Sequence, residues 1–516
     1  MNLANIFIKN LQQQENKIAL VGLSPTGEIL WQKTRKDLWQ EAFLWLGALK
    51  NYGIKKGDRV ALSLSKSSSL ITAHIALLAS GAIVVPLNPS LTEVELEQLL
   101  IKATPCLAIT NMSFLAQNPN LSTYINGDCW IESLIAKETT NLSNIYNLTE
   151  VLNNSTSTTK IVNTNKNDIA LIVFTSGTTG IPKGVGLTHK NLFTNLTALL
   201  IDTWKCTEND RLLHVLPPHH IHGLGLGIYG SLLVGNTIFL LEKFDPLTVL
   251  KSIDNHQITL FMGVPTLYHR MLAIEGDFNI SSIRLFISGS APLSSETFQE
   301  FNKRFGSTIL ERYGLTETLF NASNPLNGVR RAGSVGLAVK GVKIKLFDPE
   351  KLIPITKGKV GEIWIKGENV FPGYWQDPEN TSLVFQDGWF RTGDLGQFDS
   401  DGYLSIVGRI KELIIVGGTN VTPGEIEKVL EKVPNILECA VTSIPDLDLG
   451  EKIVACLVTK ANVNLKDLEL ELKTVCQKQL APYKRPKQYC FITALPRNVM
   501  GKLERNKLKT FVQSLH

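Results

Sequence analysis

The chain has 516 residues, 43% of them hydrophobic and 19% charged, and its net charge is only +5 (52 basic minus 47 acidic residues). A chain of this length is expected to split into at least two domains. The small charge, with no basic run interleaved with aromatic residues, argues against a nucleic-acid-binding protein.

Cysteine usage and hydropathy bear on the cellular compartment. The seven cysteines are scattered and contain no CxxC pair, which argues for a reducing environment and against a zinc ribbon. The N-terminal segment lacks the pattern of a secretory signal. The longest apolar stretch, AHIALLASGAIVVPLNP, is broken by Gly81 and Pro86, which favours a helix followed by a buried strand over a membrane span. We expect a cytoplasmic protein without membrane contact.

Segments typical of helices and strands alternate through the first hundred residues. A helix is expected over 37–53, ending at Gly53, then a strand over 58–64 and a helix over 92–103. Such alternation favours α/β layers with a mostly parallel sheet. Residues 138–167 are rich in Asn, Ser and Thr and are expected to form a surface loop or linker. The apolar run IALIVF, 169–174, predicts a buried strand.

The predicted secondary structure changes twice in the second half of the chain. Short β-rich runs (VKIKLF, GEIWIKG and GYLSIVG) between about 333 and 407 predict a smaller antiparallel or barrel-like subdomain. After Gly408 the pattern is mixed again, with the helix-like EIEKVLEKV and the strand-like IVACLVT. We therefore expect an N-terminal domain over 1–407, a hinge over 408–411 and a C-terminal domain over 412–516.

The predicted strand 169–174 runs directly into FTSGTTGIPKG, residues 174–184. Glycines in such a loop permit backbone N–H groups to converge on an anion, which predicts a phosphate site. The spacing does not fit the P-loop pattern G-x-x-x-x-G-K-[ST], because Pro182 stands where the second glycine belongs and Gly184 follows Lys183. A kinase or P-loop NTPase is therefore excluded, and a flexible turn without a ligand is the alternative.

This stretch resembles the phosphate loop of the acyl-adenylate-forming superfamily, [ST]SGTTGxPKG, and four more of its segments follow in the same order. They are RYGLTET (312–318), RTGDL (391–395), GRIKELIIVGGTNVTPGEIE (408–427) and LPRNVMGKLER (495–505). The resemblance implies an α/β fold. It consists of a large N-terminal domain of layered α/β subdomains with a β-rich subdomain, and a small mobile α+β C-terminal domain. It also implies ATP, Mg2+ and CoA as cofactor and co-substrates.

The resemblance implies a nucleotide site with distinct roles for its members. Asp394 would accept both ribose hydroxyls, Glu317 would offer a hard oxygen to Mg2+, and Tyr313 would stack on adenine. A turn aspartate and a helix-capping glutamate are the alternatives for the first two. Thr316 would bond the α-phosphate. The residues expected to bind ATP are Thr175, Ser176, Gly177, Thr178, Thr179, Gly180, Lys183, Gly289, Ser290, Ala291, Pro292, Arg312, Tyr313, Gly314, Asp394 and Arg409.

Three further residues are implied near the C-terminus. Lys502 corresponds to the superfamily's adenylation lysine, although its charge alone would fit a solvated basic tail. A positioned ammonium would stabilise the charge that builds when a carboxylate attacks the α-phosphate. Lys411 would be the hinge about which the C-terminal domain turns between half-reactions. Gly418 would line the tunnel for the pantetheine arm of CoA.

The segment PPHHIHGLG, 217–225, bears on the acid that is activated. Its HxH spacing could bind a metal, but no nearby Cys or acidic residue completes such a site. The resemblance places His220 as a catalytic residue beside the acyl pocket. The HxHGL pattern and the surrounding segments are similar to malonyl-CoA synthetases. A second carboxylate on the substrate needs a cationic partner, which the resemblance assigns to Arg284, with His222, Ser288 and Leu315 completing the pocket.

These observations predict a ligase that converts a carboxylate, with malonate favoured, to an acyl-adenylate and then to a CoA thioester. Lys502, Thr316, Glu317 and His220 are the expected catalytic residues. Leu315 stands where the family usually has Met, which keeps methylmalonate or a longer diacid open. Four further functions stay open. They are an aryl, fatty or o-succinylbenzoate ligase, an adenylation domain of a peptide synthetase, a stand-alone adenylation enzyme that loads a carrier protein, and an inactive nucleotide-binding regulator.

Overall fold

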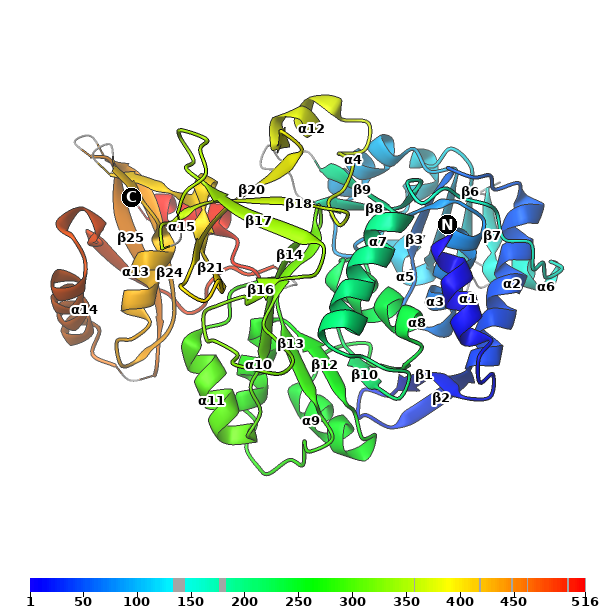
Figure 1. Ribbon diagram of the computed structural model, residues 1–516, viewed down its shortest axis with the longest axis horizontal. Helices are drawn as coiled ribbons and strands as arrows, with labels where there is room; N and C mark the ends of the chain where they lie inside the picture. Colours follow the sequence, from blue (N-terminus) through cyan, green and yellow to red (C-terminus); the bar gives the residue numbers. More distant parts are fainter. Residues whose placement is uncertain are drawn as a thin grey trace.

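The computed structural model describes residues 1–132, 144–175, 182–356, 358–416, 419–446, 449–461, 463–498 and 501–515. Four sheets are present in these residues. Two large sheets occupy the N-terminal side of the molecule, a smaller one follows, and the fourth belongs to the C-terminal domain at the far end (Figure 1). The prediction of an α/β fold with a large N-terminal and a smaller C-terminal domain is confirmed.

The first large sheet has the strand order β7-β6-β5-β3-β4-β8-β9. Its strands are parallel except for the pair of β8 and β9. The strand bounds are β3 (Arg59–Ser63), β4 (Ile83–Pro86), β5 (Leu107–Asn111), β6 (Asp128–Glu132), β7 (Ile145–Asn147), β8 (Ile169–Thr175) and β9 (Lys183–Thr188). The helices connecting this region are α2 (Arg35–Tyr52), α3 (Ser68–Ala79), α4 (Glu93–Ala103), α5 (Met112–Gln117), η1 (Leu121–Tyr124) and α6 (Leu148–Asn153).

The second large sheet has the order β16-β15-β14-β13-β12-β10-β11-β1-β2. The strands from β14 to β1 are parallel, and β2, β15 and β16 add antiparallel edges. The bounds are β1 (Ile18–Leu23), β2 (Ile29–Thr34), β10 (Arg211–His214), β11 (Thr237–Leu240), β12 (Leu260–Gly263), β13 (Leu285–Ser288), β14 (Leu310–Leu315), β15 (Leu319–Ser323) and β16 (Leu337–Ala338). Its helices are α1 (Leu3–Leu11), α7 (His189–Leu196), η2 (Thr197–Thr203), η3 (His222–Tyr229), α8 (Gly230–Val234), α9 (Pro246–Asn255), α10 (Pro265–Leu272) and α11 (Ser295–Phe305).

Local sequence explains the boundaries of α2. Thr34 caps its N-terminus by accepting a hydrogen bond from the backbone of Asp37, whose carboxylate bonds back to Thr34. Gly53 ends the helix at a φ of 96°, in the left-handed region where a side chain is disfavoured. The apolar face of α2 then packs on α3, within a core that joins both large sheets. Helix α2 therefore begins two residues before its predicted start and ends at the predicted glycine.

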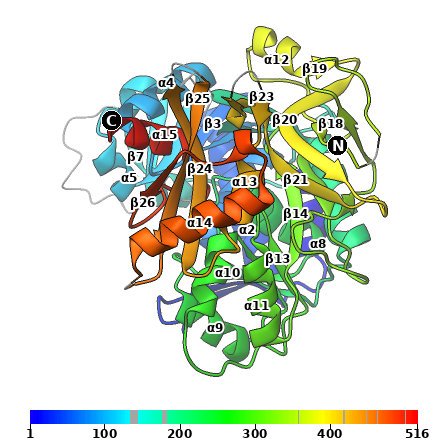
Figure 2. The same ribbon diagram turned by 90° about the vertical axis from the view of Figure 1, so that its left-hand side faces the viewer.

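The chain passes from the third sheet to the fourth between Arg409 and Ile414, next to the predicted hinge at 408–411. The third contains β17 (Val342–Phe347), β18 (Gly361–Gly367), β19 (Phe385–Gln386), β20 (Trp389–Phe398) and β21 (Leu404–Arg409), all antiparallel, with α12 (Pro378–Val384) beside it. The fourth contains β22 (Ile414–Val416), β23 (Thr419–Val421), β24 (Ile436–Asp446), β25 (Gly450–Thr459) and β26 (Gln488–Phe491). Its helices are α13 (Pro423–Leu430), α14 (Leu465–Gln479) and α15 (Arg505–Ser514), which lie in front in Figure 2. The short helical turns η4 (Ile410–Glu412) and η5 (Pro482–Lys484) complete the set.

One predicted loop is wrong in part. Residues 138–167 were expected to lack regular structure, but β7 and α6 lie between 145 and 153. Their polar side chains do not prevent this, because Asn147 caps α6 by accepting hydrogen bonds from Thr149 and Glu150. Residues 138–143 lie outside the described part of the chain.

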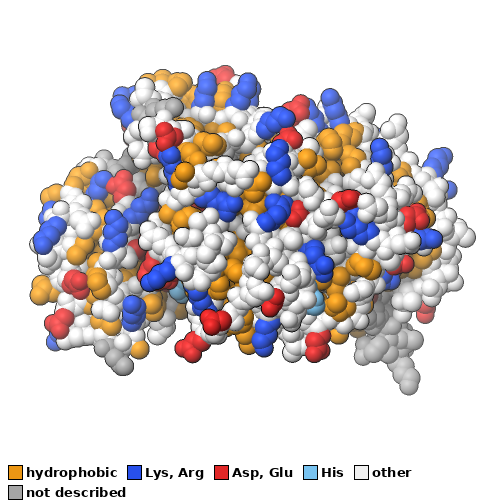
Figure 3. Space-filling model, turned by 60° about the horizontal axis from the view of Figure 1, so that its bottom comes forward, with side chains coloured by type: hydrophobic (Ala, Val, Ile, Leu, Met, Phe, Trp, Pro, Cys, Tyr) orange, Lys and Arg blue, Asp and Glu red, His pale blue; other side chains and the backbone are white. Residues whose placement is uncertain are grey.

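The surface carries both signs of charge. On the face shown in Figure 3, basic and acidic side chains are interspersed rather than gathered into one field. None of the described helices combines the length and the apolar character that crossing a membrane would require.

Candidate active site

The predicted site residues gather where strands of the two large sheets end. Strand β13 ends at Ser288 and leads into 289–292, while β14 ends at Leu315 and leads into Thr316 and Glu317. Ligands of open parallel sheets commonly bind beyond these carboxyl ends. Gly314 is required there by close approach, because a Cβ at this position would lie 2.1 Å from the carbonyl oxygen of Leu319.

Asp394 lies at the centre of the nucleotide cluster. Its side chain is only 3% exposed. Its Oδ2 accepts a hydrogen bond from the Tyr313 hydroxyl at 2.6 Å, and its Oδ1 pairs with Nε of Arg409 at 2.7 Å. The Asp394 carboxylate raises the pKa of the Arg409 guanidinium. The structure thus brings three predicted ATP residues together, although the Tyr313 hydroxyl is engaged with Asp394.

Lys183 and Glu317 both contact the side chain of Tyr374. The Lys183 ammonium lies 5.0 Å from the centre of the Tyr374 ring and donates to Oδ1 of Asn380 at 2.6 Å. The Tyr374 hydroxyl donates to Oε1 of Glu317 at 3.2 Å. Burial raises the pKa of Glu317, and the bond from Tyr374 opposes that shift. A carboxylate oxygen is the kind of ligand that Mg2+ prefers, so Glu317 fits the predicted metal role.

Lys502, in the C-terminal domain, lies near Asp394 and Glu317. It follows a tight turn in which the backbone of Gly501 donates to the carbonyl of Asn498, and Arg497 pairs with Leu503. Gly501 has a φ of 70°, and a Cβ there would lie 2.5 Å from Oγ1 of Thr266, so the turn is packed against α10.

The charged residues around Lys502 affect the pKa of its ammonium. Lys502 remains accessible to solvent. Loss of surrounding water lowers its pKa, Arg409 lowers it further, and the carboxylates of Asp394, Glu412 and Glu317 oppose the shift. Lys502 is therefore close enough to interact electrostatically with Asp394 and Glu317, the carboxylates predicted to bind ribose and Mg2+.

Several predicted residues lie outside the described part of the chain. They are Ser176, Gly177, Thr178, Thr179 and Gly180 of the phosphate loop, and Gly418 of the predicted CoA tunnel. At the edges of the loop, Thr175 ends β8 and its hydroxyl donates to the carbonyl of Lys183 at 3.4 Å. Lys411 lies in the turn η4 between the third and fourth sheets.

The histidine segment passes from half-buried residues at 217–221 to the buried His222. His222 opens a stretch of π-helix, a feature that often marks functional sites. Its Nδ1 shares a hydrogen bond of 3.1 Å with the hydroxyl of Ser290. Burial lowers the pKa of His220 to about 4 and that of His222 well below its ordinary value, so both rings are neutral at pH 7. In the described residues, no three His, Cys, Asp or Glu side chains gather in a group that could hold a metal ion.

The structure corrects the predicted place of Arg284. This residue precedes β13, at the opposite end of the strand from Ser288. Its guanidinium is committed to Asp210, with Nε and Nη2 each 2.7 Å from a carboxylate oxygen, and Nη1 donates to the carbonyl of Trp204. Arg284 therefore does not reach the acyl pocket, because the parallel strand carries it to the far edge of the sheet.

Arg312, predicted to bind ATP, is buried beside Gly289 and the end of β13. It stands one residue past the partner of Ser288 in the pairing of β13 with β14, and its side chain is 4% exposed. A Cβ on Gly289 would lie 2.6 Å from its Cζ, so the guanidinium sits directly behind Gly289. Neither Nε nor Nη2 of Arg312 has a hydrogen-bond partner among the described residues.

Other buried polar atoms around Arg312 are also unsatisfied. Within the part of the chain that is described, Oγ of Ser288 and Nε2 of His220 and His222 have no hydrogen-bond partner. Burial, and after it the positive charge of Arg312, lowers the pKa of His222, and burial lowers the pKa of Arg312 to about 9. Buried polar groups are normally hydrogen-bonded, so a cluster of unsatisfied donors indicates a place for a polar ligand. Leu315, the remaining predicted pocket residue, is half-buried at the end of β14.

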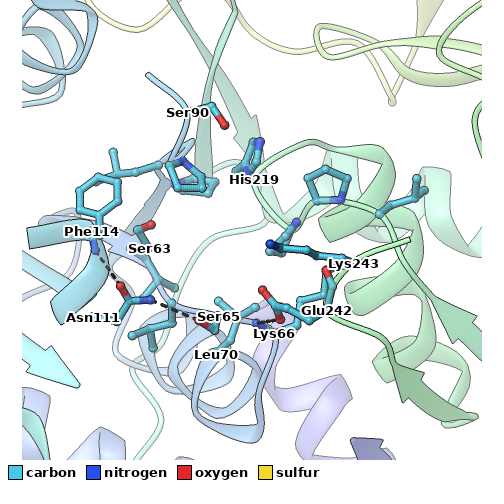
Figure 4. A pocket seen from close by; sticks show the side chains of 18 of the residues that line it. Ser63, Ser65, Lys66, Leu70, Ser90, Asn111, Phe114, His219, Glu242 and Lys243 are labelled. Carbon is cyan, nitrogen blue, oxygen red and sulfur yellow. Dashed lines mark hydrogen bonds between the residues drawn. The ribbon is translucent and has the colours of Figure 1, made fainter. Parts of the chain in front are cut away.

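A cavity of about 470 Å³ opens beside His219, between the two large sheets. Ser63 and Asn111 of the first sheet line one side, and Glu242, which follows β11 of the second sheet, lines another (Figure 4). The Lys66 ammonium closes part of its wall by donating to the carbonyls of Val215, Leu241 and Glu242. A cavity of this size can take a small molecule or the arm of a larger one.

Sequence reasoning missed Tyr374, Asn380 and the place of Arg312. Tyr374 and Asn380 lie in FPGYWQDPENT, which has a turn-like composition and no separate chemical signal. Arg312 was visible inside RYGLTET, but which face of β14 it occupies depends on the pairing with β13.

Comparisons with known proteins agree with this site. The AMP-binding enzyme family matches residues 7–375, and the AMP-binding enzyme C-terminal domain matches 425–502. The long-chain-fatty-acid–CoA ligase of Bacillus subtilis is 34% identical over 92% of this chain and 89% of its own length. The malonate–CoA ligase of Arabidopsis thaliana is 32% identical over 90% and 80%. The crystal structure of ATP-bound MatB from Rhodopseudomonas palustris matches with a TM-score of 0.89 and 34% identity, covering all of both chains.

The family match spans most of the chain, and these relatives match it along almost its whole length. The nucleotide cluster around Asp394 and the nearby Lys502 fit the chemistry of adenylate formation. The chain therefore belongs to the AMP-binding enzymes of the acyl-adenylate-forming superfamily and is an acyl-CoA synthetase.

Proposed function

We propose that this acyl-CoA synthetase acts on malonate. The observation that carries the proposal is the buried guanidinium of Arg312, whose Nε and Nη2 lack partners among the described residues. A buried cation is costly unless it is paired, and a carboxylate that binds it through two parallel hydrogen bonds is its best partner. A short diacid can present one carboxylate to Arg312 and the other to ATP.

Adenylation is the first half of the proposed reaction. One carboxylate oxygen of malonate attacks the α-phosphorus of ATP, and the bond to the β-phosphate oxygen breaks to release pyrophosphate. Lys502 would neutralise charge that builds at the α-phosphate, while Lys183 would hold the leaving pyrophosphate. Thr316 would donate to an α-phosphate oxygen. Glu317 would hold Mg2+, which when bound supplies positive charge against the phosphates.

Thioester formation is the second half. We propose that the C-terminal domain turns about Lys411, which removes Lys502 and admits the CoA thiol. The sulfur attacks the acyl carbon, the bond to the AMP oxygen breaks, and the thiol proton passes to solvent. His220 is neutral because burial lowers its pKa to about 4, so its Nε2 can accept a hydrogen bond from the thiol. The cavity beside His219 offers room for the arm of CoA.

Ligases for other acids are the alternatives within this family. Methylmalonate keeps the second carboxylate and would still pair with Arg312. A fatty, aryl or o-succinylbenzoate substrate is favoured less, because a long apolar or aromatic body would have to pass the polar group formed by Arg312, His222 and Ser288. A carrier-protein thiol in place of CoA would leave the adenylation half unchanged.

A panel of carboxylic acids tests the proposal. The purified enzyme is given ATP, Mg2+ and CoA with malonate, methylmalonate, succinate, benzoate, octanoate or o-succinylbenzoate, and AMP formation is measured. Malonate or methylmalonate should give the highest kcat/KM. A signal with octanoate or benzoate and none with malonate would overturn the substrate assignment while leaving the ligase chemistry intact.

A further inference from the structure

Residues 371–381 connect the phosphate-loop strand to the Glu317 hairpin through the backbone. The amide of Trp375 donates to the carbonyl of Gly184 at 2.7 Å, next to Lys183. At its other end, the amide of Phe371 donates to the carbonyl of Glu317 at 2.9 Å. The segment thus fixes the spacing between the strand that carries Lys183 and the turn that carries Glu317.

Tyr374 connects the same two residues through its side chain. The flat face of the ring carries the Lys183 ammonium at 5.0 Å, a cation–π arrangement, while the hydroxyl bonds Oε1 of Glu317 at 3.2 Å. The backbone of Tyr374 is held in turn, because its amide donates to Oγ1 of Thr381 at 2.9 Å. The half-buried Tyr374 side chain therefore contacts both the Lys183 ammonium and the Glu317 carboxylate, and it restrains the position of each.

Asn380 supplies the second support for Lys183. Its amide nitrogen donates to both oxygens of Asp377, at 3.0 Å and 2.9 Å, which turns its carbonyl oxygen toward Lys183. Asp377 is itself fixed as the N-cap of α12. A lysine ammonium has three N–H donors, so one bond to Asn380 leaves two for phosphate oxygens.

We propose that Tyr374 and Asn380 are positioning residues for the adenylation step, which hold Lys183 and Glu317 in register with the pyrophosphate end of MgATP. Tyr374 acts on both groups, and Asn380 acts on Lys183 alone. The inference rests on the proposed adenylation reaction but not on malonate as the acid. It predicts that loss of the Tyr374 hydroxyl affects the metal dependence, whereas loss of the Asn380 carbonyl affects nucleotide binding.

Four variants separate these roles. Tyr374→Phe keeps the ring beneath Lys183 and removes only the hydroxyl from Glu317. Asn380→Ala removes the acceptor for Lys183. Tyr374→Leu removes both functions of the tyrosine. Ser382→Ala is the matched control, since Ser382 is exposed on α12, the helix that carries Asn380, and its hydroxyl donates to the carbonyl of Glu379.

Binding of MgATP by calorimetry, without any acid, is the first measurement. Asn380→Ala should raise the dissociation constant by about tenfold, the effect of losing a hydrogen bond to a charged group. Ser382→Ala should bind as the unmodified enzyme does. Unchanged or tighter binding by Asn380→Ala would overturn its assignment, since a carbonyl that merely competes with phosphate for Lys183 would give tighter binding.

The Mg2+ dependence of pyrophosphate release is the second measurement. Tyr374→Phe should raise the Mg2+ concentration for half-maximal rate severalfold and leave the KM for the acid unchanged, and Tyr374→Leu should add an Asn380-like loss of MgATP binding. A uniform drop in kcat with an unchanged Mg2+ requirement would mean that Tyr374 is only structural.

The two proposals fail separately. If the unmodified enzyme binds MgATP but releases AMP with none of the acids, the proposed function is wrong, and the binding constants of the variants still decide the roles of Asn380 and Tyr374.

Discussion

Replacing Arg312 by methionine tests the acyl pocket most directly. Methionine fills a similar length without a charge, and the packing of the side chain against the Phe320 ring, 4.8 Å from the guanidinium carbon, can be kept. In the enzyme without substrate, the cation is 4% exposed, and its Nε and Nη2 have no partner in the described residues. The variant should therefore fold at least as stably as the unmodified protein, since it removes an unpaired buried charge.

The loss should appear only when a substrate carries a second negative charge. Breaking a buried ion pair by removing one partner costs about 3–5 kcal/mol. Because about 1.4 kcal/mol corresponds to tenfold, kcat/KM for malonate should fall roughly a hundred- to a few thousand-fold. Malonamate, in which an uncharged amide replaces the distal carboxylate, should be affected by less than about tenfold in kcat/KM.

Arg284→Met is the matched control. Arg284 is bound to Asp210 through two bonds of 2.7 Å at the opposite end of β13, so its loss leaves a buried carboxylate unpaired. We expect a lower unfolding temperature and no change in the preference for malonate over malonamate. The assay is steady-state pyrophosphate release with each acid, together with thermal unfolding of both variants. Equal losses of kcat/KM for the two acids in Arg312→Met would refute the pairing of Arg312 with a second carboxylate.

Three further changes probe the rest of the site. Lys502→Ala should slow malonate-dependent pyrophosphate release by about 10²–10³-fold, whereas thioester formation from added malonyl-adenylate should persist; unchanged pyrophosphate release would show that another group serves adenylation. Gly501→Val should likewise impair adenylation more than thioester formation, because a Cβ at this left-handed position would lie 2.5 Å from Oγ1 of Thr266; equal effects on both half-reactions would contradict this contact. Burial raises the pKa of Glu311 to about 8, so the folded protein holds a proton that the unfolded chain has lost, and stability should fall as pH rises from the ordinary glutamate value through about 8. Each pKa unit is worth about 1.4 kcal/mol, and Glu311→Gln should flatten this part of the unfolding profile; an unchanged slope would be evidence against the buried proton.

The nucleotide motifs were readable from the sequence because their chemistry depends on neighbouring residues. A strand ending in a glycine-rich loop, or a glycine that ends α2 at a φ of 96°, is decided within a few positions of the chain. The same holds for the order of the motifs, which predicted the family before any contact was known. The functional roles of individual residues, such as the hinge at Lys411, remain predictions.

The choice between Arg284 and Arg312 shows what only the tertiary structure decided. Arg284 directly precedes β13, and Arg312 lies within the neighbouring parallel strand β14 and opens the motif RYGLTET. The pairing of Ser288 with Glu311 puts Arg312 level with Gly289 at the carboxyl end of the sheet. Arg284 lies five positions before Gly289, roughly 16 Å back along an extended strand, where Asp210 takes its charge.

The same reason explains why the sequence alone did not show where Tyr374, Asn380 and Lys502 lie relative to the rest of the site. Each lies far along the chain from the groups that it contacts or approaches, so no local pattern could reveal the relation. Sequence by itself determined the reaction class, since the motifs are local. Strand register, and the docking of the Lys502 turn on α10, decided where Arg312 and Lys502 lie, because they bring together side chains that the chain order keeps apart.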